Sequence, residues 1–587
     1  MQNLLARTFS NKNFLFLGIA YAFLAYAHIP VKIFPHAFDK NAVPQFIVLI
    51  LVSSIFGIYI LRRRNKFHLL GKITLLLWIL IIAVLTSAIL NIDFVGSLVG
   101  ETGRFAGVIS LFCLILVGLF HSQFNLSQFY KVILVYSVVI FGMAIIGILQ
   151  KFKLIELPGE ASVNGTLGNL DFFGAFLGTS LPFLVFLWLR NSGWRINKLR
   201  IYLIFAGVIE LIAIYFAGPL QAYVDIAIVI IAGGVYFLRK YIPHYDYSLN
   251  VRTIVGTFFI LIWIEFIFLM PFLGYFIPVL GNDEQVKIRG DFWLAAARQF
   301  FSSPIFGIGP DQYGNYYEKY RTFNSLEKYS NLLSNDAHSA PLQTMATLGI
   351  LGVLAFILLL ALVIRAFLII ISRDKDNKKF YYALALYVFV FISNAAVSPI
   401  TNPHKYLVWA VCGFFIGMAY RGEGSQFNYK MIPVLVSSLV IPSLVVLANF
   451  IPAQLAYLSA NETYAKNKNA EIDIKQSRFL PCTIYYNNVA IILSNKKDNQ
   501  LLKYTQSQLK SNPRCVDAWI VLSKIRFNQN EIALMKEPIY KLIEIAPTRM
   551  EVVTLASLYA NKAKDSQLND LVDKQLQILN PGIQIIK

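Results

Sequence analysis

The chain has 587 residues, of which 57% are hydrophobic and 14% are charged. Soluble domains usually carry about 25% charged residues, so this composition excludes an ordinary soluble protein and predicts an integral membrane protein. The 47 Phe and 31 Tyr residues fit a lipid-facing body with aromatic belts. The first apolar run follows Arg7 and Lys12 but lacks a small-residue cleavage site, so we expect a first span and no cleaved signal peptide.

The apolar runs predict an all-α fold, a polytopic transmembrane helical bundle of about 12–13 spans. A bilayer core needs about 20 apolar residues per helix. Windows of that length fall at residues 13–30, 43–61, 72–90, 104–121, 131–150, 171–190, 199–217, 219–238, 252–274, 345–371, 380–398, 404–420 and 431–452.

Lys and Arg gather in alternate loops between these windows. With a cytoplasmic N-terminus, the inside loops hold basic clusters such as residues 62–66 and 373–379, whereas the outside loops hold few basic residues. An excess of Lys and Arg marks the cytoplasmic side. The pattern therefore predicts that the loop 281–341 and the C-terminal region are extracytoplasmic. Topology accounts for much of the formal net charge of +20, so we expect no nucleic-acid partner.

The chain turns polar after the last window, which divides it into a membrane domain, 1–453, and an extracytoplasmic helical domain, 454–587. Pro513, Pro547 and Pro581 are spaced 34 residues apart, the period of the tetratricopeptide repeat. Such repeats offer a surface for a protein partner, and the alternative is a plain helical bundle that caps the membrane body. Cys482 and Cys515 lie in this region, and the sequence leaves open whether they pair.

The polar loop 281–341 holds the residues best suited to chemistry. A guanidinium matches phosphate oxygens two at a time, and a histidine takes a proton from a hydroxyl near neutral pH. We predict His338 and Arg289 as catalytic residues. The substrate-binding candidates in the loop are Trp293, Arg298, Tyr313, Arg321 and Asp336. This set suits the transfer of a group from a diphosphate carrier to an alcohol.

Two further segments on the same side add substrate-binding candidates. Arg104 stands at the start of an apolar window, where it either snorkels to the interface or binds substrate. Asn169 ends the stretch Gly165-Thr166-Leu167-Gly168-Asn169, whose glycines permit a tight turn. The seven histidines are scattered along the chain, and we expect neither a metal nor another cofactor.

Acidic residues inside the apolar windows are a separate signal. Glu210, Asp225 and Glu265 are costly to place in a membrane, and such residues are functional candidates by default. We hypothesise that at least one of them pairs with Arg104 or Arg289.

These segments, in this order, resemble the O-antigen ligase and O-antigen polymerase superfamily over about residues 90–420. The matching pieces are Gly103-Arg104-Phe105-Ala106-Gly107, then Gly165-Thr166-Leu167-Gly168-Asn169 with Phe172-Phe173, then Arg289 and Trp293 leading to Pro304-Ile305-Phe306-Gly307-Ile308-Gly309, then Ala337-His338 followed by Leu342-Gln343 and Leu348-Gly349-Ile350-Leu351-Gly352. Some members of this superfamily also carry tetratricopeptide tails.

The resemblance implies a GT-C-like, metal-independent glycosyltransferase of the bacterial inner membrane. Such enzymes move an oligo- or polysaccharide from undecaprenyl diphosphate to an acceptor hydroxyl on lipid A core, on another glycan or on a protein. It also implies that His338 activates the acceptor and that Arg289 holds the donor diphosphate. A direct displacement would invert the anomeric centre. The family's Gly-Ser-Arg-Gly is absent, because this chain has Ala217-Gly218-Pro219-Leu220-Gln221 there, and Ser339 replaces the usual Asn.

Two other classes of function stay open. One is a transporter or flippase for a lipid-linked saccharide, and the other is a membrane scaffold that recruits partners through its repeats. Transporters of this kind bind substrate near the midplane, whereas the polar residues here gather at the outer edge, which favours an enzyme. The sequence does not separate ligase from polymerase, because both use the same donor. The glycan, its acceptor and the oligomeric state are equally open.

Overall fold

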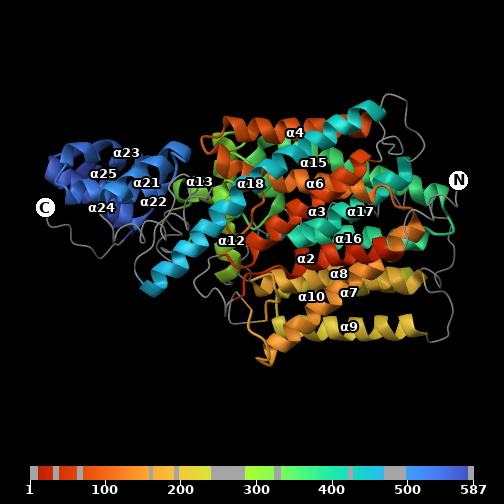
Figure 1. The fold of residues 1–587 in the computed structure, drawn as a ribbon. Helices are drawn as coiled ribbons and strands as arrows, with labels where there is room; N and C mark the ends of the chain where they lie inside the picture. The colour runs from red at the N-terminus through yellow and green to blue at the C-terminus, as the bar shows by residue number, and fades with distance from the viewer. Residues whose placement is uncertain are drawn as a thin grey trace.

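The structure is a computed structural model that describes residues 11–30, 39–62, 71–157, 163–190, 197–238, 284–322, 332–420, 428–467 and 498–579. Within these ranges the chain forms helices joined by turns and contains no strand, which confirms the predicted all-helical class. Figure 1 shows a bundle of long helices with a group of shorter C-terminal helices at one end.

The long helices fall on the predicted windows. They are α2 (Asn11–Tyr26), α3 (Ala42–Arg62), α4 (Gly71–Leu90), α6 (Val108–His121), α7 (Leu126–Lys151), α8 (Leu170–Arg190), α9 (Lys198–Ala217), α10 (Leu220–Leu238), α15 (Ala340–Arg373), α16 (Lys378–Ala395), α17 (Asn402–Tyr420) and α18 (Asn428–Asn467). Among the described residues, seven helices are long and apolar enough to cross a membrane, as a multi-pass membrane protein requires. The predicted window 252–274 lies outside the described residues.

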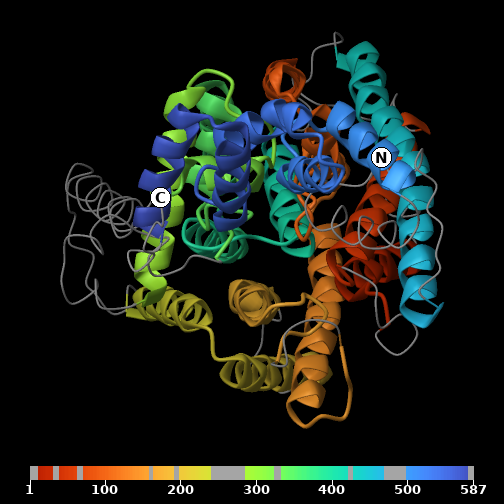
Figure 2. The same cartoon turned by 90° about the vertical axis from the view of Figure 1, so that its left-hand side faces the viewer.

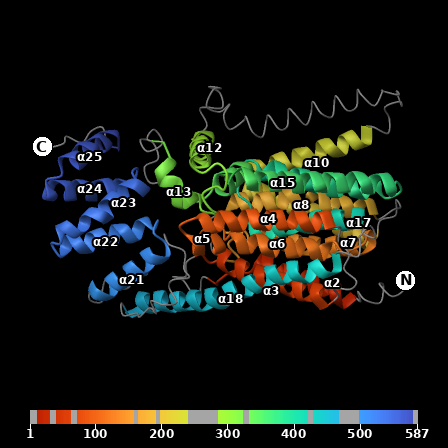
Figure 3. The ribbon, with the colours of Figure 1, turned by 90° about the horizontal axis from the view of Figure 1, so that it is seen from above.

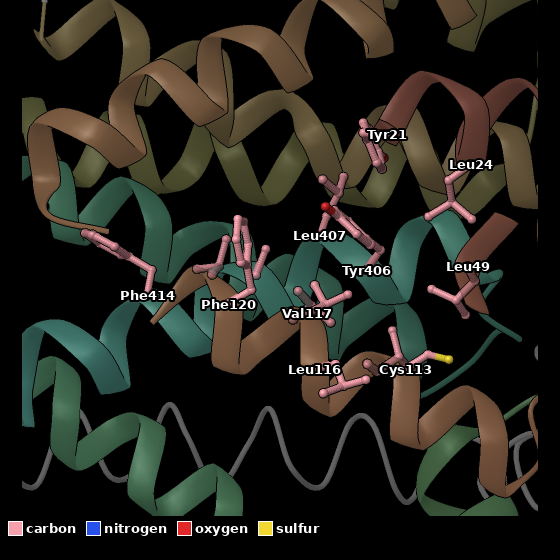
Figure 4. Packing of buried hydrophobic residues seen from close by; sticks show 14 of the residues in the cluster. Tyr21, Leu24, Leu49, Cys113, Leu116, Val117, Phe120, Tyr406, Leu407 and Phe414 are labelled. Carbon is pink, nitrogen blue, oxygen red and sulfur yellow. The ribbon is translucent and has the colours of Figure 1, made fainter. Parts of the chain in front are cut away.

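The centre of the bundle is built around α6, which packs against α3, α17 and α18 (Figure 4). The rings of Phe56 and Phe120 stack at 4.1 Å between α3 and α6. Helices α6 and α17 meet backbone to backbone, because a Cβ added at Gly413 would lie 2.7 Å from the Gly118 Cα. Small residues at a helix contact permit this approach and are typical of membrane bundles.

Shorter helices cover one end of the bundle, called here the polar end. They are α5 (Phe94–Val99), α12 (Glu284–Ser302) and α13 (Tyr313–Tyr320), followed by the C-terminal helices α21 (Asp498–Ser511), α22 (Val516–Asn528), η2 (Ile532–Met535), α23 (Lys536–Ile545), α24 (Met550–Ala563) and α25 (Ser566–Leu579). Figure 3 shows α12 and α13 between the bundle and the C-terminal helices. Seen from that end in Figure 2, the blue C-terminal helices leave the yellow α9 and α10 uncovered.

The long helix α18 joins the bundle to the C-terminal helices. The predicted domain boundary at 453/454 falls inside this continuous helix. Ala453 and Tyr457 of α18 share an apolar cluster with Tyr504 of α21 and Ala518 of α22. Cys515 is disulfide-bonded, and Cys482 lies outside the described residues.

Helix α15 is broken at Gly349, whose φ of 63° and ψ of −165° suit only glycine. The segment 304–309 fills the break. Ile308 N donates to Ala346 O at 3.0 Å, and Ile350 N donates to Pro304 O at 2.8 Å. A Cβ at Gly349 would press on the Ile305 carbonyl and lie 2.7 Å from Gly307 N. The segment 304–309, which follows α12, is therefore hydrogen-bonded to the first turns of α15 around Gly349.

We expect Gly349→Ala to lower the free energy of unfolding by about 2 kcal/mol, because it combines backbone strain with a steric clash. Gly234→Ala on α10 is the matched control, since a Cβ there meets nothing within 4 Å. Thermal unfolding of the two purified variants in detergent measures the difference. Equal melting temperatures for both variants would show that the close backbone contact at Gly349 does not stabilise the fold.

Candidate active site

His338 lies in a turn at the polar end, just before α15. Its φ is 53°, in the left-handed region that few non-glycine residues adopt. The Asp336 side chain holds this turn, because its Oδ1 accepts a hydrogen bond from His338 N at 2.6 Å. Gln343 Oε1 accepts from Ala337 N at 2.9 Å on the α15 side. An Asp that accepts from the N–H two residues later is a common way to fix such a turn.

The same turn sets the tautomer of His338. Its Nδ1 lies 3.0 Å from the Asp336 carbonyl oxygen. A carbonyl only accepts hydrogen bonds, so Nδ1 carries the proton and Nε2 presents its lone pair when the ring is neutral. The ring packs on Phe292 of α12, with centroids 4.9 Å apart and planes inclined by 33°. The imidazole is therefore fixed in orientation, with its basic nitrogen available.

Burial lowers the pKa of His338 below its ordinary value of 6.5. The Asp336 carboxylate acts in the opposite direction, and the positive charges of Arg104 and Arg289 lower the pKa further. Because two cations and burial outweigh one carboxylate, the ring is neutral at pH 7 and can accept a proton.

Arg104 is tied to this turn rather than free at the interface. Its Nε donates to Asn335 Oδ1 at 3.0 Å, and its Nη1 lies 3.6 Å from Asp336 Oδ2. Asn335 Nδ2 in turn donates to Thr102 O at 3.2 Å. The window predicted to start at residue 104 is corrected here, because α6 begins at Val108 and Arg104 sits in the preceding turn. The turn keeps the guanidinium beside Asp336.

Arg289, Phe292 and Trp293 lie on one face of α12, at the helical spacing that the sequence predicts. Arg289 is half-buried, and its positive charge helps to lower the pKa of His338. Trp293 is only 4% exposed. Tyr313 of α13 is fully buried, and its hydroxyl donates to Phe292 O at 2.8 Å. The structure thus places Tyr313 in a supporting position behind Phe292.

Two predicted substrate-binding arginines lie away from His338. The Arg321 guanidinium is bound to the C-terminal helices, with Nε 2.8 Å from Thr548 Oγ1 and Nη2 2.8 Å from Thr548 O. Arg298 is exposed and donates to Tyr320 O at 3.2 Å. Asn169 lies across from Arg104 in the wall of a pocket of about 190 Å³.

The C-terminal region makes further polar contacts with α13 and with α5. The Arg514 guanidinium stacks on Tyr316 with its carbon 3.6 Å from the ring centroid. Arg549 Nη1 lies 3.9 Å from Glu318 Oε2. Asn512 Nδ2 donates to Asp93 Oδ2 at 2.8 Å, which ties the loop before α22 to α5. These contacts join α5 and α13 to the C-terminal helices.

Sequence reasoning missed a buried charged group behind Arg104. Asp311 Oδ2 accepts from Glu101 N at 2.8 Å and from Ala106 N at 2.9 Å. Burial raises the pKa of Asp311 to about 6, although Lys405 at the start of α17 opposes the shift. The signal was weak, because Asp311 and Lys405 are single charges far apart in the chain. Among the described residues, no group of three His, Cys, Asp or Glu side chains could hold a metal ion.

Of the three intramembrane acids, Asp225 and Glu210 lie in the described part of the chain, and neither forms an ion pair with Arg104 there. Asp225 Oδ2 accepts from Asn394 Nδ2 at 3.0 Å, and Arg104 pairs with Asp336 instead. Glu210 is 1% exposed, and neither of its carboxyl oxygens has a hydrogen-bond partner among the described residues. Glu265 lies outside the described residues.

No model of a known protein family matches this sequence, and no curated protein matches it.

We expect Asp336→Asn to lower the pKa of His338 further, because the substitution removes the one carboxylate that raises it and leaves both arginines. The amide keeps an oxygen for His338 N, so the turn survives. An NMR titration of the labelled histidine ring in the full chain measures the shift. The control is Asp376→Asn in an exposed turn. A raised or unchanged pKa in Asp336→Asn would show that the carboxylate does not act on the ring.

Proposed function

We propose that this protein is a membrane glycosyltransferase that moves a glycan from a polyprenyl-diphosphate carrier to an acceptor hydroxyl at the polar end of the bundle. One observation carries the proposal. A neutral histidine with a fixed tautomer stands beside Arg104 and Arg289, at the edge of a membrane-spanning body. A base for a hydroxyl and cations for a diphosphate are the two groups that this transfer needs.

The chemistry is a single displacement. The acceptor hydroxyl gives its proton to His338 Nε2 as its oxygen attacks the anomeric carbon of the donor glycan. The bond between that carbon and the phosphate oxygen breaks, and its electron pair leaves with the polyprenyl diphosphate. A glycosidic bond forms with inverted configuration at the anomeric carbon. No oxidant, reductant or nucleotide takes part.

The two arginines differ in what they offer the leaving group. Arg104 is already paired with Asp336 at 3.6 Å, so part of its charge is neutralised within the protein. Arg289 is half-buried on α12 and lies close enough to His338 to influence its pKa. We assign Arg289 to the departing diphosphate, as the family resemblance implies, and Arg104 to orienting the turn and the glycan.

The basic loops support a bacterial inner-membrane location with a cytoplasmic N-terminus and an extracytoplasmic polar end. In this orientation the site faces acceptors outside the cytoplasm, either lipid A core, a growing glycan or a protein. Consecutive C-terminal helices pack on one another from α21 to α25, with Pro513 and Pro547 just before α22 and α24. This register supports tetratricopeptide-like repeats, whose free surface would receive a protein partner.

Glycan transfer in vesicles with a labelled polyprenyl-diphosphate oligosaccharide tests the proposal. We expect His338→Ala to slow transfer about a hundredfold or more, because it removes the base. His28→Ala is the matched control, since His28 Nδ1 also contacts the carbonyl two residues earlier, at 2.8 Å. Equal rates in both variants would refute the role of His338, and passage of unreacted label across the membrane would indicate a transporter.

The pH profile gives a second test. His338 is active when neutral, and its pKa lies below 6.5, so the rate is constant above this pH and falls as the pH drops through the lowered pKa. In Asp336→Asn we expect the acidic limb to move to still lower pH. A profile with its acidic midpoint above 6.5 would contradict the assignment of His338 as the base.

A further inference from the structure

A second feature of the polar end is a pocket of about 190 Å³ next to Arg104. Four chain segments enclose it: the start of α3, the turn before α6, the loop before α8 and the start of α17. Its lining residues are Asp39, Asn41, Ala42, Gln45, Gly103, Arg104, Leu167, Gly168, Asn169, Phe172, Ile400, Thr401 and Asn402. Pockets for drug-sized ligands usually measure about 300–1,000 Å³, so this one suits a single small ring.

Two side chains in the wall have polar atoms without a partner among the residues that the structure describes. Asn402 is 3% exposed, and its Oδ1 accepts no hydrogen bond from the described residues. Thr401 Oγ1 beside it is likewise buried and unpaired within that part of the chain. Buried polar atoms in proteins are almost always satisfied, and an unpaired one is costly. The unpaired atoms therefore point to a ligand with hydroxyl groups.

The charges of the wall disfavour an anion. Asp39 contributes a carboxylate whose Oδ2 accepts from Gly103 N at 2.7 Å. Arg104 contributes the opposing charge but is paired with Asp336. The pocket therefore has no surplus positive charge to offer a diphosphate. Amides, a hydroxyl and one charged side chain of each sign suit a neutral ligand that both donates and accepts hydrogen bonds.

The ring of Phe172 gives the pocket wall an apolar surface. It lies 5.7 Å from the guanidinium carbon of Arg104, so an apolar face stands beside the polar wall. A pyranose presents the same combination, with hydroxyls around its edge and C–H groups on its face. A lipid chain would leave Asn402 Oδ1 and Thr401 Oγ1 without a hydrogen bond, and a phosphate would meet the Asp39 carboxylate.

We propose that this pocket is a binding subsite for one neutral sugar ring. The inference rests on the proposed transfer function for its purpose: the ring belongs to the glycan that reacts at His338. Arg104 connects the two places, because it lines the pocket and pairs with Asp336, which fixes the His338 turn. A sugar seated in the pocket therefore contacts the same guanidinium that orients the base.

Saturation-transfer NMR on the full chain in nanodiscs tests binding without any need for activity. The probes are D-glucose, D-galactose, N-acetyl-D-glucosamine and L-rhamnose at about 10 mM, because single sugars typically bind in the millimolar range. Mannitol, an open-chain polyol, serves as the control ligand, and inorganic pyrophosphate as the competitor. We expect at least one pyranose to receive saturation above mannitol and to be retained when pyrophosphate is added. No pyranose signal above mannitol, or displacement by pyrophosphate, would overturn the proposal.

Two variants locate the binding. Thr401→Val removes a hydroxyl that has no protein partner, so the fold should be unharmed while sugar binding weakens about fivefold. Ala42→Leu fills the pocket and should abolish binding. Thr554→Val on the exposed face of α24 is the matched control. Unchanged binding in both pocket variants would place the sugar elsewhere.

The same variants separate this inference from the proposed function. If His338→Ala loses transfer but keeps sugar binding, while Ala42→Leu loses both, both proposals stand. If no transfer is found but the pocket variants still lose binding, the transfer function fails and the sugar subsite survives. If transfer proceeds normally in Ala42→Leu and Thr401→Val, the subsite is wrong and the transferase is not.

Discussion

The polar end of this protein depends on one carboxylate. Asp336 accepts a hydrogen bond from His338 N through one oxygen and faces Arg104 through the other, while its backbone carbonyl takes the His338 Nδ1 proton. These three contacts fix the turn, the tautomer and the position of the nearest cation together. The carboxylate also opposes the lowering of the His338 pKa by burial and by both arginines. The Asp336 side chain thus influences both the orientation of the His338 ring and the pKa of that ring.

The surroundings of Asp336 are held by elements distant in the chain. The break at Gly349 lets the segment 304–309 bond to α15, which fixes the end of α12 next to the His338 turn. Behind α12, α13 is held on its outer side by Thr548 and Arg514 of the C-terminal region. The C-terminal helices therefore act as part of the scaffold of the candidate site.

A membrane body imposes the location of this chemistry. A charged group at the centre of a bilayer is costly, and the described spans place their few buried acids beside amides or without partners. The polar-end turns carry the charges instead, where backbone N–H groups can satisfy them, as they do for Asp311 and Asp39. In the proposed function, the neutral pocket would hold a glycan while the neighbouring arginines would neutralise a leaving anion.

Much of this arrangement was readable from the sequence, because it is local. Apolar length predicted the helices of the bundle, and helical spacing placed Arg289 with Trp293 on one face, whereas the break at Gly349 inside the predicted span 345–371 appeared only in the structure. Tertiary structure alone decided that Arg104 pairs with Asp336, that Arg321 binds Thr548 rather than standing near His338, and that Asp311 lies behind the site. These contacts join residues more than 200 positions apart. Periodicity carries no information about such pairs, since they form only when packing of the bundle brings their segments together.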